Sequence, residues 1–318
     1  MSTSENIVAA TLHYFTPPPD GSKPWWQINA DPTTGITPRN YENKPFNVSV
    51  ENVRGKQHLF KLDDAGFQYF RVPTKVTDFS DDDKVREEYY PEQADVLKSL
   101  TGASRVVIFD HSTHPFQTHF LRVITLTRLK PPAIRRHRPD STLDDPQNRR
   151  PISWVHVDQT PASSEARVHK HLPASLVPSL LARRYQIVNL WRPISHTALD
   201  FPLALCDCRS VGRDDLVATT LVYPDKQGEL FSVRRNEAHQ WKYLRGMEPD
   251  EGVLIKWSVR LQFVRISAII EASLFSFDSI QDGSVAILTP HTAFVDPTTP
   301  KDAPLRESIE LRALVFYD

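Results

Sequence analysis

The first residues in this sequence with an evident chemical use are a histidine and an aspartate two positions apart. His156 and Asp158 lie in the short apolar run 154–158. In a β-strand, side chains at positions i and i+2 point to the same face, so both groups can reach one point in space. Two histidines and one carboxylate form the facial triad that leaves coordination positions open on non-haem Fe(II). A satisfied structural pair is the competing interpretation, and a metal site needs a third ligand from elsewhere.

A candidate third ligand lies near the C-terminus. His291 stands in the run Thr-Pro-His-Thr-Ala-Phe over 289–294, and Arg306 follows it by 15 positions (306 − 291). A guanidinium binds a carboxylate through two parallel hydrogen bonds. Ser308, two positions further along a strand, would add a hydroxyl from the same face. Arg306 and Ser308 could therefore bind a carboxylate together.

A predicted strand over 185–191 offers two more polar groups. Alternation places Tyr185, Ile187, Asn189 and Trp191 on one face. Asn189 and Tyr185 could contact a co-substrate or substrate there. Hydrogen-bonded positions in the core are the alternative.

Six stretches of the sequence resemble the Fe(II)/2-oxoglutarate-dependent oxygenase superfamily, and within it the AsaB/CmcJ-like fungal hydroxylase/desaturase family. Together they run over nearly the whole chain, which makes the set far more specific than any one stretch. They are residues 107–111 (Val-Ile-Phe-Asp-His), 134–139 (Ile-Arg-Arg-His-Arg-Pro), 155–160 (Val-His-Val-Asp-Gln-Thr), 189–194 (Asn-Leu-Trp-Arg-Pro-Ile), 289–294 and 304–312 (Pro-Leu-Arg-Glu-Ser-Ile-Glu-Leu-Arg).

The resemblance implies a dioxygenase that hydroxylates or desaturates a small secondary metabolite or an amino-acid-derived substrate. Its implied cofactors are Fe(II), the co-substrate 2-oxoglutarate, and O2. The residues it assigns are the metal ligands and catalytic centre His156, Asp158 and His291, and the co-substrate contacts Arg306, Ser308, Tyr185 and Asn189. Arg306 would take the far carboxylate of 2-oxoglutarate.

The predicted strands and helices that position these groups indicate a mainly β fold with flanking helices. The resemblance implies that this fold is a double-stranded β-helix, or jelly roll. We expect a single domain over 1–318, with an N-terminal arm and helices over 1–105 and the jelly-roll core over 106–318. Proline-rich residues 1 to about 60 predict loops and short strands. Further strands are predicted over 106–109, 218–223, 252–256, 284–288 and 309–316, and helices over 91–100 and 174–183.

Two segments interrupt the family pattern, near 113–133 and 257–276. Each adds about 20 glycine-free residues of mixed apolar and basic character. One hypothesis is that they are translated introns, and the other is that they are genuine surface insertions, which loops tolerate. Two alternatives to an active enzyme follow: a catalytically inactive jelly-roll binding protein, or the defective product of a gene model that retains introns.

Bulk properties narrow the partners to a small molecule. A net charge of −1 over 318 residues gives no electrostatic signature for nucleic acid or an anionic membrane. Cys206 and Cys208 are the two cysteines, too few for a structural zinc site or a disulfide framework. With no signal-peptide pattern at the start, a cytoplasmic location is expected. The oligomeric state has no signature in the sequence.

Overall fold

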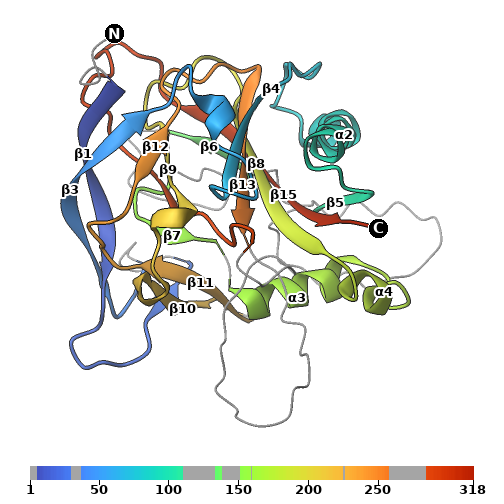
Figure 1. Cartoon of the computed structure of the whole chain (residues 1–318), viewed down its shortest axis with the longest axis horizontal. Helices are drawn as coiled ribbons and strands as arrows, with labels where there is room; N and C mark the ends of the chain where they lie inside the picture. The colour runs from blue at the N-terminus through green and yellow to red at the C-terminus, as the bar shows by residue number, and fades with distance from the viewer. Residues whose placement is uncertain are drawn as a thin grey trace.

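Two β-sheets face each other in this computed structural model, which describes residues 6–29, 37–109, 133–137, 151–158, 160–224, 226–257 and 284–318 (Figure 1). Sheet A has nine strands, in the order β1 (Ile7–Thr16), β3 (Glu42–Asn52), β12 (Trp241–Tyr243), β9 (Leu203–Cys206), β14 (His291–Ala293), β7 (His156–Val157), β11 (Gln227–Val233), β10 (Leu216–Val222) and β2 (Trp25–Gln27). Sheet B has the order β4 (Phe67–Arg71), β13 (Glu251–Trp257), β8 (Tyr185–Pro193), β15 (Glu307–Phe316) and β5 (Arg105–Phe109), and β6 (Ala133–Arg136) also pairs with β15.

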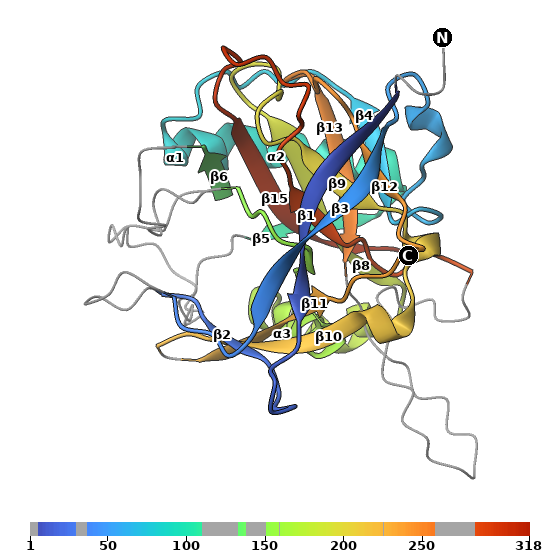
Figure 2. The same ribbon diagram turned by 90° about the vertical axis from the view of Figure 1, so that its left-hand side faces the viewer.

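Helices flank the sheets. The helix α2 (Tyr90–Thr101) begins with a proline in its first turn and ends at Gly102, whose φ of 72° is the left-handed conformation that favours glycine. It lies outside sheet B, as Figures 1 and 2 show. The remaining short helices are α1 (Asp82–Lys84), the π-helical turn η3 (Val85–Tyr89), α3 (Pro161–His171), α4 (Val177–Leu181), and the 3-10 turns η2 (Gln57–Leu59), η4 (Cys208–Ser210) and η5 (Arg213–Asp215).

The strand β15 shows how alternation divides the core. Its odd-numbered residues, such as Leu311 and Val315, pack in one apolar cluster with Leu97 of α2. Its even-numbered residues Leu314 and Phe316 pack between the sheets with residues of β1, β11 and β12. The even-numbered face therefore points into the space between the two sheets, and the first half of that face is polar.

The structure confirms a mainly β fold with flanking helices, but it corrects two sequence predictions. Residues 1–60 do not form only loops and short strands, because β1 and β3 pair antiparallel over ten residues. The alternating burial of β1 gives the reason, since a strand with one inward face outweighs nearby prolines. The strand predicted over 284–288 is also wrong. Regular pairing starts at His291, after Pro290, which has no N–H to donate.

Two other sequence predictions concern a helix and the two inserts. The helix predicted over 174–183 is shorter, and Pro178 lies in its first turn. The inserts predicted near 113–133 and 257–276 lie outside the described residues, apart from their edges.

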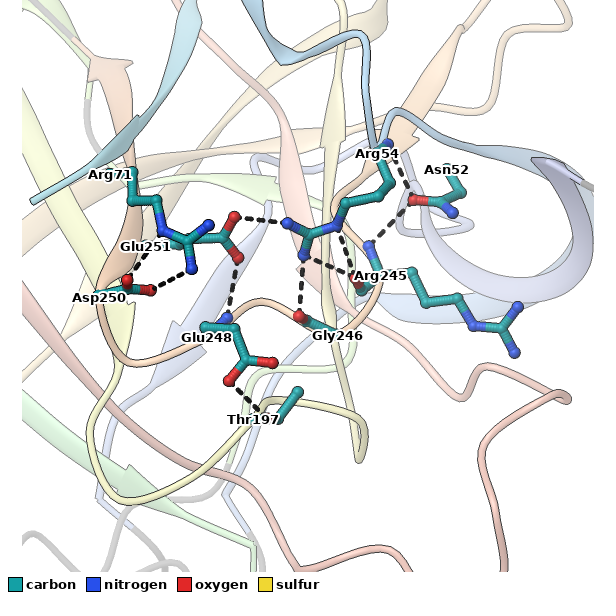
Figure 3. A network of polar contacts seen from close by, with 9 residues as sticks. All are labelled: Asn52, Arg54, Arg71, Thr197, Arg245, Gly246, Glu248, Asp250 and Glu251. Carbon is teal, nitrogen blue, oxygen red and sulfur yellow. Dashed lines mark hydrogen bonds and ion pairs between the residues drawn. The ribbon is translucent and has the colours of Figure 1, made fainter.

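A polar network fixes the connection between sheets A and B at one end of the molecule (Figure 3). The guanidinium of Arg54, just after β3, pairs with the buried carboxylate of Glu251 at the start of β13 and donates to the Gly246 carbonyl at 2.8 Å. The other oxygen of Glu251 accepts from the backbone N–H of Glu248 at 3.0 Å, and Glu248 accepts from Thr197 at 2.8 Å. The strands and the loop after β8 are thereby held in one arrangement.

Gly66 lies directly against the segment that carries His291. Its φ is +85°, and its carbonyl accepts a hydrogen bond from the Thr289 hydroxyl at 2.6 Å. A Cβ at this position would lie 2.6 Å from the Leu288 carbonyl oxygen. Gly55 has the same φ, yet a Cβ there would meet nothing within 4 Å.

We therefore predict different stability losses at these two glycines. Gly55→Ala should cost about 1 kcal/mol of unfolding free energy, the penalty for a left-handed alanine. Gly66→Ala should cost about 1–3 kcal/mol more, because the added methyl group is overpacked against backbone. Urea denaturation of both variants measures the difference, and equal losses would contradict the packing described here.

Candidate metal centre

His156 and His291 are directly opposite each other on two paired strands. They are cross-strand partners in the antiparallel pair of β7 and β14, and their ring centroids lie 4.5 Å apart. Asp158 follows β7 immediately. One ligand atom from each of the three residues lies within 4.8 Å of the others. Within the described residues, this is the one group of three or more His, Cys, Asp or Glu side chains found close enough to hold a metal ion.

Backbone hydrogen bonds set the tautomer of both histidines. His156 Nδ1 lies 2.9 Å from the Trp154 carbonyl oxygen, and His291 Nδ1 lies 3.0 Å from the Thr289 carbonyl oxygen. A carbonyl oxygen only accepts, so each Nδ1 carries the proton. Each Nε2 then keeps a lone pair for a metal, with its ring fixed by the outer hydrogen bond.

The carboxylate of Asp158 is oriented by two donors from sheet B. Its Oδ2 accepts from Asn189 Nδ2 at 2.8 Å and from Arg312 Nη2 at 3.2 Å. Asn189 and Arg312 are direct partners in the pairing of β8 with β15, which explains why they reach the same oxygen. The other oxygen, Oδ1, lies 3.4 Å from His156 Nε2 and remains on the metal side.

Charge and burial keep Asp158 and His291 in their metal-binding forms. Burial alone would raise the pKa of Asp158, but the Arg312 guanidinium and the neighbouring His156 hold that pKa well below its usual range. Burial lowers the pKa of His291, with a further contribution from His156. The site therefore presents one ionised carboxylate and a neutral His291 imidazole at neutral pH, which is the donor set that suits Fe(II).

Arg306, directly before β15, lines the same cavity as the candidate metal ligands, and Ser308 on β15 contacts it from beside the cavity. The cavity is lined by Arg135, Ile152, His156, Asp158, Trp191, Leu203, His291, Thr292, Ala293, Arg306, Glu310 and Arg312. Arg306 Nε donates to Ser308 Oγ at 3.1 Å, and its guanidinium lies over the Trp191 ring at 5.0 Å. The side chain is buried, yet within the described residues no carboxylate lies within ion-pairing distance of it.

The loop after β8 fixes the position of Arg306. Phe201 has a φ of 44°, the one positive value among the described non-glycine residues, and its carbonyl accepts from Arg306 Nη1 at 2.7 Å. The Asp200 carboxylate accepts from the Arg306 backbone N–H at 2.9 Å and contacts His137 Nδ1 at 2.6 Å. Strained backbone conformations of this kind gather at functional sites.

The structure places the two remaining candidate site residues, Asn189 and Tyr185, at different distances from the metal centre. Asn189 points at the metal centre through its contact with Asp158. Tyr185 shares the inward face of β8 but is not among the cavity-lining residues, and its ring stacks on Phe316 with centroids 5.7 Å apart. The alternation predicted for β8 is therefore right, although Tyr185 lies deeper in the core.

Sequence reasoning did not identify the partner of Asp158. Arg312 pairs with Asp158 and also with Glu310, at 2.6 Å. Arg306, Glu310 and Arg312 lie at even steps along one strand, so the alternation signal was present in the sequence. The choice of Arg306 as the carboxylate anchor leaves Arg312 a structural or salt-bridge role, but the sequence does not identify Asp158 as its partner.

Comparison with known proteins decides the family. A protein-family profile described as an oxidoreductase/YMDC permease-like domain matches residues 12–316. The hydroxylase/desaturase efuI of Hormonema carpetanum is 32% identical over 322 residues, which cover 98% of this chain and 95% of that protein. The hydroxylase/desaturase CTB9 of Cercospora beticola is 31% identical over 297 residues, covering 90% and 80%. A solved structure of a variant of the iron and alpha-ketoglutarate-dependent endoperoxidase NvfI superposes with a TM-score of 0.77 at 25% identity, covering 99% of both chains.

The chain belongs to the Fe(II)/2-oxoglutarate-dependent oxygenase family. It is an Fe(II)/2-oxoglutarate-dependent dioxygenase of the hydroxylase/desaturase type, and its cofactors are iron, 2-oxoglutarate and O2. The two facing sheets are the jelly-roll core of that family. No helix in the described part of the oxygenase is long and apolar enough to cross a membrane.

The orientation of Asp158 leads to a prediction for this oxygenase. Asn189→Leu removes one of the two donors to Oδ2, so the carboxylate should turn more freely and the affinity for Fe(II) should fall about 10- to 100-fold, the usual cost of losing an outer-shell partner. Gln186→Leu is the matched control, because Gln186 is buried on the same strand and bonds Tyr317. Calorimetric titration with Mn(II) in place of iron measures the metal affinity of both variants. Equal affinities in the two variants would show that Asn189 has no role in metal binding.

Proposed function

We propose that this oxygenase hydroxylates or desaturates a small secondary metabolite or an amino-acid-derived compound, with iron held by His156, Asp158 and His291. The observation that carries the proposal is the convergence of two groups of side chains on one buried cavity. Three ligand atoms within 4.8 Å of one another form one group. Arg306, which lines the cavity, and Ser308, which accepts a hydrogen bond from Arg306 Nε, form the other, as the site for the far carboxylate of 2-oxoglutarate.

Each residue in this proposal has a separate task. When bound, iron and 2-oxoglutarate supply the oxidation of a C–H bond by O2, with succinate and CO2 as co-products. His156, His291 and Asp158 would hold the ion, because a set of two histidines and one carboxylate leaves coordination positions open for other ligands. Arg306 and Ser308 orient the co-substrate by its far end. Buried Trp191 and Ala293 keep that part of the cavity dry, which strengthens the polar contacts made there.

The contacts of the donor set do not favour an inactive binding protein. All three ligands keep their outer hydrogen bonds, and the buried guanidinium of Arg306 faces the same cavity. The relatives named hydroxylase/desaturase are themselves enzymes by name. Purified protein should release succinate from 2-oxoglutarate only when Fe(II) is added. A protein that binds Fe(II) tightly but releases no succinate with or without candidate substrates would contradict the proposal.

The ligand assignment makes its own prediction. His156→Ala, Asp158→Ala and His291→Ala should each lower Fe(II) affinity at least about 100-fold and abolish turnover, because each removes one of three donors. The folded state should persist in the two histidine variants, whereas Asp158→Ala should also lower stability, because it removes one of the two carboxylates that pair with buried Arg312. His169→Ala on α3 is the control, because that histidine is exposed and far along a helix. Metal titration together with circular dichroism tests the set, and wild-type affinity in His291→Ala would show that the triad is wrongly assigned.

Substitutions of Arg306, just before β15, and of Arg312, on β15, should affect the binding of different ligands. Arg306→Lys keeps the charge but loses the two-pronged donor set, so the KM for 2-oxoglutarate should rise about 10-fold or more while Fe(II) affinity stays near wild type. Arg312→Lys should change that KM far less, because Arg312 already pairs with Asp158 and Glu310. Its effect should fall on Fe(II) affinity instead. Titration of 2-oxoglutarate and of Fe(II) against both variants measures these effects. A larger rise in the KM for 2-oxoglutarate in Arg312→Lys than in Arg306→Lys would transfer the anchor role to Arg312.

A further inference from the structure

A second arginine lies beside the proposed co-substrate anchor. Arg135 on β6 is the direct cross-strand partner of Ser308 on β15, and it lines the same cavity as Arg306 and the metal ligands. Cross-strand partners point to the same face of a sheet, so Arg135 shares the inward face with Ser308. Its neighbour Arg136 points to the other face, where it pairs with Glu307 at 2.8 Å.

Two guanidinium groups so close together raise the free energy of the site without an anion. The pKa of Arg306 is lowered to about 9 by burial and, next, by the positive charge of Arg135. The described charged residues that line the cavity are three arginines, Arg135, Arg306 and Arg312, and two acids, Asp158 and Glu310. Both acids pair with Arg312, and neither forms an ion pair with the Arg306 guanidinium, although Glu310 and Asp200 lie near enough to offset part of its positive charge.

The donors at that end suit a carboxylate. Arg306 uses Nε on Ser308 and Nη1 on the Phe201 carbonyl, and neither of these bonds uses Nη2. Ser308 accepts from Arg306, so its own hydroxyl proton is available to donate. A carboxylate has two oxygens and about four lone-pair positions, which is enough for Arg306, Ser308 and one further guanidinium.

We propose that Arg135 is a second guanidinium for the far carboxylate of 2-oxoglutarate, acting together with Arg306 and Ser308. This inference rests on the co-substrate site proposed above. It makes the far end of the cavity selective for a dicarboxylate, because the neutral tail of another 2-oxo acid would offer no acceptor to the guanidinium groups of Arg306 and Arg135. Arg135 is in this account a residue that contacts the co-substrate, whereas Asp200 and Phe201 only position Arg306.

The test compares two 2-oxo acids that differ at one end. Mn(II)-loaded protein is titrated calorimetrically with 2-oxoglutarate and with 2-oxopentanoate, which has a methyl group in place of the far carboxylate. Arg135→Gln should weaken 2-oxoglutarate binding about 10-fold, the loss of one charge-assisted hydrogen bond, and leave 2-oxopentanoate binding unchanged. Arg136→Gln, one position along the same strand but on the other face, should change neither.

Three outcomes would overturn the inference. A change of less than twofold for 2-oxoglutarate in Arg135→Gln would show that Arg135 does not touch the co-substrate and leave it for an anionic group of the substrate. Equal losses for both acids would show a general effect on the metal end or on the fold. Equal losses of 2-oxoglutarate affinity in Arg135→Gln and Arg136→Gln would show a general effect on strand β6 and no specific contact by Arg135.

Arg306→Gln in the same titrations distinguishes this inference from the proposed function. It should weaken 2-oxoglutarate binding more than Arg135→Gln does. If Arg306→Gln has no effect, the co-substrate site itself is wrongly assigned. If only Arg135→Gln has no effect, that site stands and Arg135 alone loses its role.

Discussion

The ion pair between Asp158 and Arg312 crosses the space between the two sheets, and the metal centre depends on it. Asp158 follows β7 of sheet A, and Arg312 lies on β15 of sheet B. Buried charges are costly unless they are paired and hydrogen-bonded, and here Asn189 and Glu310 complete the set. Because Arg312 and Asn189 occupy one carboxylate oxygen, the other oxygen faces His156 and His291. The attraction that joins the sheets thus also orients the metal ligand.

The inward face of β15 changes from polar to apolar along its length, and this change divides the interior. Glu310 and Arg312 line the cavity and Ser308 contacts Arg306 beside it, whereas Leu314 and Phe316 pack in the core between the sheets. Rigid strands hold side chains to the small tolerances that catalysis requires. The loop with Phe201 and Asp200 then fixes Arg306 just before the strand begins. Arg306 lies outside the strand, and it is held by hydrogen bonds to the Asp200 carboxylate and the Phe201 carbonyl.

Much of this site could be predicted because strand periodicity carries it. The two-residue spacing of His156 and Asp158, the pair Arg306 and Ser308, and the shared face of β8 follow from alternation and from the resemblance. Which strands pair could not be read from the sequence, so the opposition of Asn189 and Arg312 at Asp158 was not foreseen. Nor was the length of β1, whose alternating burial was obscured by prolines near it. Tyr185 was a candidate only because alternation fixes the face of a residue and not its depth.

A crystal structure of the protein with Mn(II) and 2-oxoglutarate tests the central claim most directly. The account predicts one ion bound by Nε2 of His156, Nε2 of His291 and Oδ1 of Asp158, with Oδ2 still held by Asn189 and Arg312. The 2-oxo acid end would chelate that ion, and the far carboxylate would lie at Arg306. An ion bound elsewhere, or a far carboxylate paired with Arg312 in place of Asp158, would contradict the account.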